Sequence, residues 1–334
     1  MGPYLDLIDE SRIYSNFGPL NNLLINRLAD YFNVHTTSLV TVANATLGIQ
    51  GAILTSGISN LEEWALPSWT FTATAAAVAN SNVEPHFFDV DEEWRLKCDH
   101  EIKNMVDVLP FGLDLNLNRI PSSVQCIVVD GAASFDSLRN LSLPKDKKIA
   151  IIVSFHATKL LPGGEGGVFI SNDEEWVTRF KSWTNFGFDK TRISKFIGTN
   201  AKLDEYSCAV ALAALDEWPR VKNNYLHITK RALEISDRSK LTVHLAMQRG
   251  FVTPYWIVSS HREKIDFVLS KLQENNIPFR RWWEYGCSEM PAYANFKKEN
   301  LENSKRIAEC TIGLPFHAFL NNNDWHLLEK TLCN

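Results

Sequence analysis

The 334-residue sequence lacks any apolar run of the roughly 18 residues that a membrane-spanning helix needs. Residues 1–16 lack a basic start followed by an apolar stretch, so we expect no signal peptide and a cytoplasmic location. A surplus of cations is also missing, because 34 Lys and Arg stand against 39 acidic residues, a formal net charge of −5. No excess positive charge is therefore available to neutralise a phosphate backbone, and we expect neither nucleic acid nor membrane as a partner.

The six cysteines lack the pattern of a metal site or of a disulfide framework. No two of them form a CxxC pair, and none stands beside histidines at metal-ligand spacing. Cys126 lies in an apolar run typical of a strand and Cys208 in a helical one, so we expect buried thiols. This usage indicates a reducing compartment, and we expect no bound metal.

The length exceeds that of one average domain, and 45% hydrophobic with 22% charged residues is ordinary globular composition. Residues 20–32 carry apolar side chains at helical spacing. Residues 205–218 form a second strong helical pattern, which we expect to end at Pro219. Beyond that proline the chain becomes rich in aromatic residues. We therefore predict a large domain over residues 1–218 and a small one over residues 219–334.

Two mostly apolar runs rich in β-branched residues, 124–129 and 149–155, are typical of strands that are covered on both faces. Shorter strand patterns precede and follow helical ones: we expect strands at 39–42, 63–67 and 83–90, and helices at 47–54 and 73–79. This order predicts a mostly parallel sheet flanked by helices.

Small and polar residues follow several of these strands, at the edge where α/β sheets bind ligands. They supply a carboxylate, an amine, two hydroxyls and an aromatic face, from Asp130, Lys159, Thr46, Ser154 and Phe71 respectively. Pyridoxal 5′-phosphate (PLP) needs this set: a lysine for a Schiff base, an acid for the pyridine nitrogen, donors for the phosphate and a flat hydrophobe for the ring. Taken singly, each residue has an ordinary explanation as a cap, a solvated side chain or core.

Five segments occur in an informative order. They are residues 67–74 (PSWTFTAT), 88–91 (FDVD), 129–133 (VDGAA), 154–167 (SFHATKLLPGGEGG) and 198–205 (GTNAKLDE). Together they resemble the DegT/DnrJ/StrS family of PLP-dependent nucleotide-sugar aminotransferases. The resemblance implies an α/β fold of the aspartate-aminotransferase type. Such a fold has a three-layer α/β/α large domain with a mostly parallel mixed sheet, and a smaller C-terminal α+β domain.

The resemblance gives catalytic roles to two residues. Lys159 would hold PLP as a Schiff base and then carry a proton between Cα of the amino donor and C4′ of the cofactor. Asp130 would pair with the pyridine nitrogen, whose positive charge favours the carboxylate. Two positions depart from the family pattern: Ala133 replaces a Gln that contacts the cofactor's phenolic side, and Leu160 replaces an Asn after the lysine.

The resemblance also implies a set of cofactor-binding residues. Ala45, Thr46 and Ser154 would hold the phosphate, and Phe71 would stack on the ring. Asn200 would reach the phosphate of the neighbouring subunit's cofactor, so we expect a homodimer with shared sites.

The implied reaction is transamination of a nucleotide-linked keto-sugar, of the 4-keto-6-deoxy kind, with glutamate as the amino donor. Its product would enter deoxyamino-sugar or surface-polysaccharide biosynthesis. Two alternatives stay open: another PLP enzyme of this fold, such as an amino-acid transaminase or a lyase, and a catalytically silent regulatory relative. Retention of Lys159 and Asp130 argues against the silent relative, and the retained lysine also disfavours the family's dehydratase branch.

Two further segments have two interpretations each. The arginines of residues 280–285 (RRWWEY) would hold a diphosphate while the aromatics stack on a base, or the whole segment is a domain-packing cluster. Residues 14–19 (YSNFGP) form an active-site loop or an ordinary turn before the first strong helix.

Overall fold

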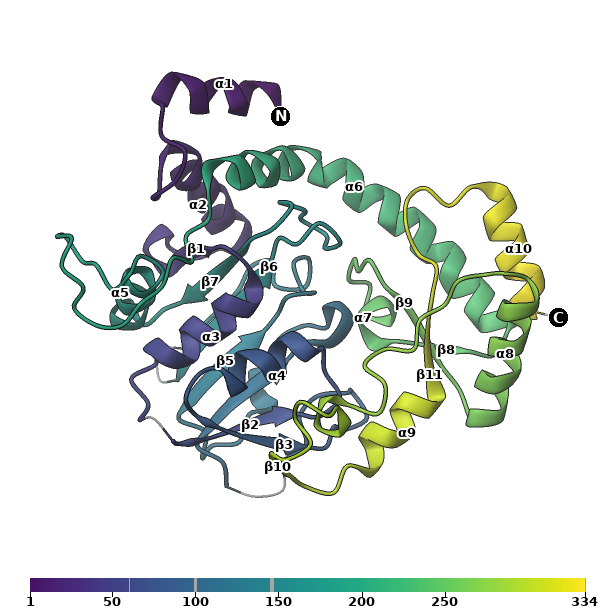
Figure 1. The fold of residues 1–334 in the computed structure, drawn as a ribbon. Helices are drawn as coiled ribbons and strands as arrows, with labels where there is room; N and C mark the ends of the chain where they lie inside the picture. The colour runs from purple at the N-terminus through teal and green to yellow at the C-terminus, as the bar shows by residue number, and fades with distance from the viewer. Residues whose placement is uncertain (60, 99–100, 145–146, 334) are drawn as a thin grey trace.

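The computed structural model describes residues 1–334 except 60, 99–100, 145–146 and 334. Figure 1 shows a large sheet with helices on both sides, and a small sheet at the far end of the long helix α6 (Glu205–Arg238). Among the described residues, no helix is long and apolar enough to cross a membrane.

The large sheet has eight strands, and its direction of pairing is mixed. They are β1 (Leu39–Val42), β2 (Glu63–Pro67), β3 (Glu84–Phe88), β4 (Asn104–Val108), β5 (Cys126–Asp130), β6 (Lys148–Ser154), β7 (Gly167–Ser171) and β10 (Lys297–Lys298). Their spatial order is β1-β7-β6-β5-β4-β2-β3-β10. Strand β7 is antiparallel to β1 and β6, whereas the pairs from β6 to β10 are parallel. The predicted mostly parallel, mixed sheet is confirmed.

Helices cover this sheet on both faces. The helices α1 (Gly2–Ser11), α2 (Pro19–Phe32) and the first half of α6 share one core, whereas α3 (Ala45–Thr55), α4 (Thr72–Ala79) and α5 (Glu174–Trp183) share the other. Alternate side chains of β5 point to opposite cores, Ile127 to the first and Val128 to the second. The β-branched runs are therefore buried on both sides, which explains why they contain no polar alternation.

The predicted buried thiols lie in these two cores. Cys126 and Cys208 have no exposed surface. Burial raises the pKa of Cys126 to about 12. Such a thiol stays protonated and is inert as a nucleophile.

The small part of the molecule is built on the three-stranded antiparallel sheet β8 (Thr242–Val243), β9 (Trp256–Ser259) and β11 (Thr311–Leu314). The helices α8 (Arg262–Glu274), α10 (Asn322–Cys333) and the second half of α6 pack around its core. Two shorter helices, α7 (Leu245–Gln248) and α9 (Glu302–Cys310), complete it. Single 3-10 turns lie at Thr36–Ser38, Pro110–Gly112, Leu117–Arg119 and Cys287–Glu289.

The prediction that a helix ends before Pro219 is wrong, because α6 continues through this proline to Arg238. A proline removes one helical hydrogen bond and crowds the carbonyl four residues earlier. Packing on both sides overrides that cost: Trp218 lies in the core of the large part, and Ala232 in that of the small part. The domain boundary near residue 219 falls inside this helix and remains a prediction.

An aromatic cluster fills the seam between the two parts. Trp283 stacks on Phe111 with ring centroids 4.7 Å apart and meets Trp69 edge-on, also at 4.7 Å. Tyr255, just before β9, packs on Phe111 at 5.5 Å. The small sheet is therefore held against the strand ends of the large one.

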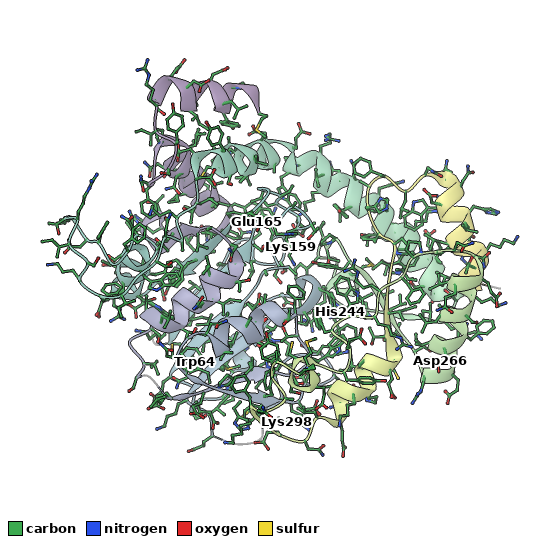
Figure 2. The ribbon with its side chains drawn as sticks, in the orientation of Figure 1. Trp64, Lys159, Glu165, His244, Asp266 and Lys298 are labelled. Carbon is green, nitrogen blue, oxygen red and sulfur yellow. The ribbon has the colours of Figure 1, made fainter. Side chains whose placement is uncertain are left out.

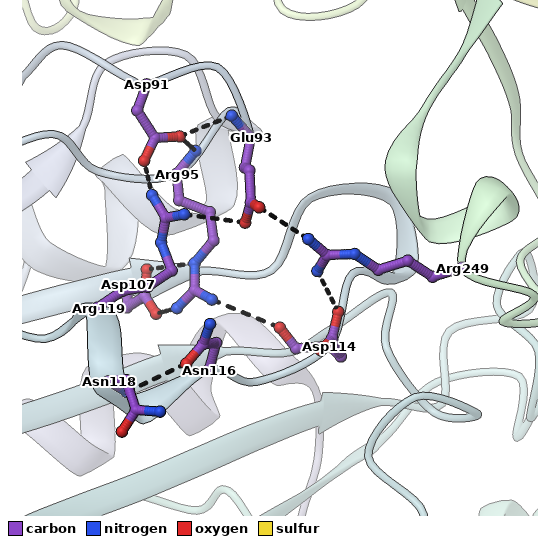
Figure 3. A network of polar contacts seen from close by, with 9 residues as sticks. All are labelled: Asp91, Glu93, Arg95, Asp107, Asp114, Asn116, Asn118, Arg119 and Arg249. Atoms are coloured by element: carbon purple, nitrogen blue, oxygen red, sulfur yellow. Dashed lines mark hydrogen bonds and ion pairs between the residues drawn. The ribbon is translucent and has the colours of Figure 1, made fainter.

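Charged side chains also join the two parts of the molecule, and Figure 3 shows their network. Arg249, just after α7, donates to Asp114 and to Glu93, each at 2.7 Å. Arg119 pairs with Asp91 and, at 2.9 Å, with Glu93. Glu93 is thus shared by two arginines from different parts of the chain, which fixes the segment after β3 against the segment after α7.

Candidate active site

The candidate site lies where the parallel strands β5 and β6 end side by side. Asp130 is the last residue of β5 and pairs in register with Ile152 of β6. Ser154 ends β6, and Lys159 follows it in the turn that leads to β7. Figure 2 shows Lys159 near the centre of the molecule.

The glycines after the lysine shape this turn. Gly164 and Gly166 have φ of +82° and +138°, which residues with a Cβ rarely adopt. Their carbonyls accept hydrogen bonds from the amides of Ala157 and Phe155, each at 2.9 Å. The glycine-rich sequel therefore folds the chain back along the lysine segment and fixes where Lys159 begins.

Asp130 is a buried carboxylate whose partners are neutral. Its side chain accepts hydrogen bonds from the Thr74 hydroxyl at 2.6 Å and from the Ala132 amide at 3.1 Å. Its exposed fraction is 7%, and within the described part of the chain no ion pair of Asp130 with a lysine or arginine is found. Burial of an unpaired carboxylate is unfavourable, so a cation in this place would be bound strongly.

The expected phosphate ligands meet at the start of α3. Asn44 caps this helix by accepting from the Leu47 amide at 2.9 Å, so Ala45 and Thr46 are its first two residues. The first amides of a helix have no acceptor within it and bind anions. Gly167 lies between this helix start and Ser154. It pairs with Ser154 in the sheet, and a Cβ on Gly167 would lie 3.3 Å from the amide nitrogen of Ala45.

Phe71 is an exposed aromatic residue at the start of α4. It is the residue before α4, three positions ahead of the Thr74 that bonds Asp130, and its exposed fraction is 56%. An aromatic ring that is exposed beside a buried carboxylate is suited to cover a flat ligand.

Lys159 has a partner that sequence reasoning missed. Its Nζ donates a hydrogen bond of 2.9 Å to the hydroxyl of Tyr255, and lies 5.6 Å from the centre of that ring. Tyr255 is 96 residues away in the sequence and belongs to the small part. Nothing in its local pattern distinguished it from the other aromatics of that region.

Asn200 is exposed, and its contacts lie away from Lys159 and Asp130. Its Oδ1 accepts from Lys202 Nζ at 2.7 Å, and it forms a β-bridge with Asn185. The next residue, Ala201, accepts a hydrogen bond from the Ala43 amide at 2.8 Å, one residue before the cap of α3. Asn200 therefore lies at the surface near the phosphate end of the site.

Residues 280–285, for which the sequence allows two interpretations, make packing contacts in the structure. Arg280 forms a backbone bridge with Gly313, and Arg281 donates to the carbonyl of Ala308 at 3.1 Å. Trp282 and Trp283 belong to the aromatic cluster of the seam. The arrangement favours a domain-packing cluster over a nucleotide clamp.

The residues present fit PLP. Asp130 offers an unneutralised carboxylate for a protonated pyridine nitrogen, and the α3 terminus with Ser154 offers donors for a phosphate. Lys159 and Phe71 offer the amine and the aromatic face. The set comes from the ends of β5 and β6 and from the starts of α3 and α4, and the fold brings it to one edge of the sheet.

Comparison with solved structures gives the class of the protein. DesI, whose crystal structure was determined in the presence of its TDP-sugar product, is 26% identical, with a TM-score of 0.85 over 99% of this chain and 88% of that one. A DegT DnrJ EryC1 StrS aminotransferase of Brucella abortus shares the fold, with 23% identity, a TM-score of 0.85 and coverage of 99% and 94%. The fold is that of aminotransferases.

The family follows from the sequence match. Residues 3–108 and 145–330 match the DegT/DnrJ/EryC1/StrS aminotransferase family, and the chain belongs to that family. Among curated relatives, the dTDP-4-amino-4,6-dideoxy-D-glucose transaminase of Shigella dysenteriae is 24% identical over 357 residues, which cover 99% of this chain and 94% of that protein. GDP-perosamine synthase of Escherichia coli O157:H7 is 25% identical over 312 residues, with coverage of 86% and 83%.

Proposed function

We propose that this aminotransferase uses PLP to transfer an amino group to a keto-sugar linked to a nucleotide, as a step in deoxyamino-sugar or surface-polysaccharide biosynthesis. The observation that carries the proposal is the buried Asp130 carboxylate with neutral partners, at the strand end beside the one that leads to Lys159. The sugar is proposed to be of the 4-keto-6-deoxy kind, and the relatives named for dideoxy-glucose transamination and perosamine synthesis support this choice.

The cofactor, when bound, supplies an electron sink and carries the amino group between the two substrates. Asp130 would pair with the positive charge of the pyridine nitrogen, since the hydrogen bonds from Thr74 and Ala132 hold its carboxylate in one place. Lys159 Nζ would remove the proton from Cα of the amino donor, which we propose is glutamate. Phe71 would cover the ring and exclude water from that face.

The phosphate would be held by the first amides of α3, at Ala45 and Thr46, together with the Thr46 and Ser154 hydroxyls. We propose that Asn200 of a second copy completes this phosphate site in a homodimer. Its exposed position supports that role, because a side chain that serves another chain must lie at the surface.

A substrate screen tests the proposal. The protein is loaded with pyridoxamine 5′-phosphate and mixed with nucleotide-linked keto-sugars that differ in nucleotide and in keto position. We expect one 4-keto-6-deoxy sugar nucleotide to abolish the absorbance of the pyridoxamine form, and free keto-sugars to leave it unchanged. Loss of that absorbance with 2-oxoacids but with no sugar nucleotide would instead assign the protein to amino-acid transamination.

A further inference from the structure

The contact between Lys159 and Tyr255 joins the two parts of the molecule at the reactive amine. Lys159 Nζ is 2.9 Å from the Tyr255 hydroxyl, and the pair is half-buried. Lysine side chains have four rotatable bonds, and an unrestrained amine samples many positions. A fixed acceptor next to Nζ restricts that freedom.

The segment that carries Tyr255 is anchored to the large part at two points before the tyrosine. The Val252 amide donates to Asp136 Oδ2 at 2.9 Å, and the Thr253 hydroxyl donates to the carbonyl of Phe111 at 2.6 Å. The Tyr255 ring then packs between Phe111 at 5.5 Å and Trp282 at 5.4 Å. The hydroxyl is therefore held by backbone anchors and by ring packing together.

The same segment passes close to Ala133. A Cβ at Gly112 would lie 3.2 Å from Thr253 Cβ and 3.3 Å from the carbonyl oxygen of Ala133, so these two residues flank one glycine. Ala133 has only a methyl group, which offers no hydrogen bond. Tyr255, on the same segment as Thr253, is a polar side chain that the structure brings to Lys159.

We infer that Tyr255 is a positioning residue for Lys159: its hydroxyl, which comes from the small part of the molecule, holds the amine in one place. The inference rests on the proposed function, since it concerns the amine that attacks the cofactor aldehyde. In that attack the neutral amine adds to the aldehyde carbon, and one water leaves as the C=N bond forms. The hydroxyl keeps the amine in place and enters no bond itself.

The test compares two cofactor forms on cofactor-free protein. PLP condenses with Lys159, whereas pyridoxamine 5′-phosphate occupies the same site without an aldehyde. Tyr255→Phe removes only the hydroxyl and keeps the ring contacts with Phe111 and Trp282. Tyr4→Phe is the matched control. Tyr4 lies on α1, away from Lys159, and its hydroxyl also bonds a charged side chain, that of Asp216 on α6, at 3.0 Å.

We expect Tyr255→Phe to slow the appearance of the PLP–lysine absorbance about tenfold, because the amine then regains the rotational freedom of a lysine side chain. Its affinity for pyridoxamine 5′-phosphate is expected to stay at the wild-type value, and Tyr4→Phe to match wild type with both. Attachment of PLP at the wild-type rate overturns the inference alone. Equal losses with both cofactors overturn it too, since they assign Tyr255 to general binding. A wild-type protein that takes up neither cofactor overturns the proposed function first, and this inference with it.

Discussion

Three buried aspartates of this chain differ in the partners of their carboxylates. Asp107 is buried against Arg95, and Asp136 is buried against Lys222 Nζ at 2.6 Å. Asp130 is as buried as Asp136, yet its hydrogen-bond donors are a hydroxyl and an amide. Burial of a carboxylate without a cationic partner lowers the stability of the cofactor-free protein, and a bound cationic ligand would remove this penalty.

Asp130→Asn should therefore separate activity from stability. Asparagine keeps an acceptor for the Thr74 hydroxyl and removes the buried charge, so thermal unfolding of the cofactor-free protein should be unchanged or shifted upward. Transamination should fall by about a hundredfold or more, because the pyridine nitrogen loses its counter-ion. Turnover near that of the wild type would show that Asp130 is the wrong acid.

Lys159 is tested by reductive labelling. Borohydride treatment of the cofactor-loaded protein should fix the cofactor mass on the peptide that contains Lys159. Lys159→Ala should lose the label, while Lys202→Ala, at a lysine whose Nζ donates to surface Asn200 and lies over the Phe186 ring, should keep it. A label on any other lysine would contradict the assignment.

At the scale of elements, the start of α2 depends on a residue of α6. Glu205 has no exposed surface, and its carboxylate accepts from the amides of Leu20 at 2.7 Å and Asn21 at 3.0 Å. Gly18, the residue before α2, has no side chain there, because a Cβ would lie 2.7 Å from Glu205 Cδ. Residues 14–19 thus serve as a structural turn that lets one helix cap another.

Replacement of Glu205 measures this cap. Glu205→Ala leaves two buried amides unpaired and should lower the free energy of unfolding by about 2–4 kcal/mol. Glu205→Gln keeps one acceptor oxygen and should lose less. Glu217→Ala, at an exposed position of the same helix, should change it little. Urea denaturation compares the three, and equal stability of Glu205→Ala and wild type would refute the cap.

At the scale of the whole molecule, the segment between α5 and α6 exposes apolar side chains. Ile193 is 63% and Ile197 94% exposed, and Phe186 is 44% exposed, all close in sequence to Asn200. Exposed apolar side chains grouped near a functional residue are suited to an interface between subunits. This grouping is consistent with the proposed homodimer.

Mixing inactive chains tests whether sites are shared. Lys159→Ala and Asn200→Ala subunits should form hybrids with one site that has both residues, so a mixture should reach about a quarter of wild-type activity. Lys159→Ala mixed with Asp130→Ala is the control, and no activity should return because both residues serve the same chain's site. If subunit exchange is demonstrated and the first mixture stays inactive, the shared site is refuted.

The seam between the two parts should be sensitive to acid. Burial, and secondarily the charge of Arg249, lowers the pKa of His244 to about 3. The unfolded chain binds this proton near pH 6.5 and the folded one only near pH 3, so folding stability is complete above pH 6.5 and falls as the pH drops toward 3. The loss is on the order of 5 kcal/mol at most.

His244→Asn should flatten this pH dependence, because asparagine does not titrate and still caps α7. Unfolding free energies of variant and wild type are compared between about pH 4 and about pH 7.5, a range that lies on both sides of the unfolded-state midpoint near pH 6.5. His326→Asn, at an exposed histidine of α10, should keep the wild-type slope. Identical slopes for His244→Asn and wild type would show that His244 is not the group responsible.

Local patterns were sufficient for much of the large sheet. The strands expected at residues 39–42 and 63–67 are β1 and β2 with the same bounds. Asp130 lies at the end of β5 and Lys159 follows β6, as expected. Burial on both faces and helical spacing are properties of consecutive residues, so they can be recognised without knowledge of the fold. Strand β4 and helix α1 were not anticipated.

Other features depend on residues that are distant in the sequence. Packing at both ends carries α6 through Pro219, although the local rule ends the helix there. The role of Trp282 and Trp283 is set by packing: Trp282 contacts Phe111, and Trp283 contacts Phe111 and Trp69, across the seam.

The chain by itself determined the kinds of groups available for chemistry and their order along the strands. Only the tertiary structure decided which of them meet: it left Asp130 with neutral partners and set Tyr255 against Lys159, 96 residues away. The physical reason is that residue types and their spacing can be recognised within a short segment of the sequence. Its contacts, and hence its charge balance, are fixed when separate layers pack together.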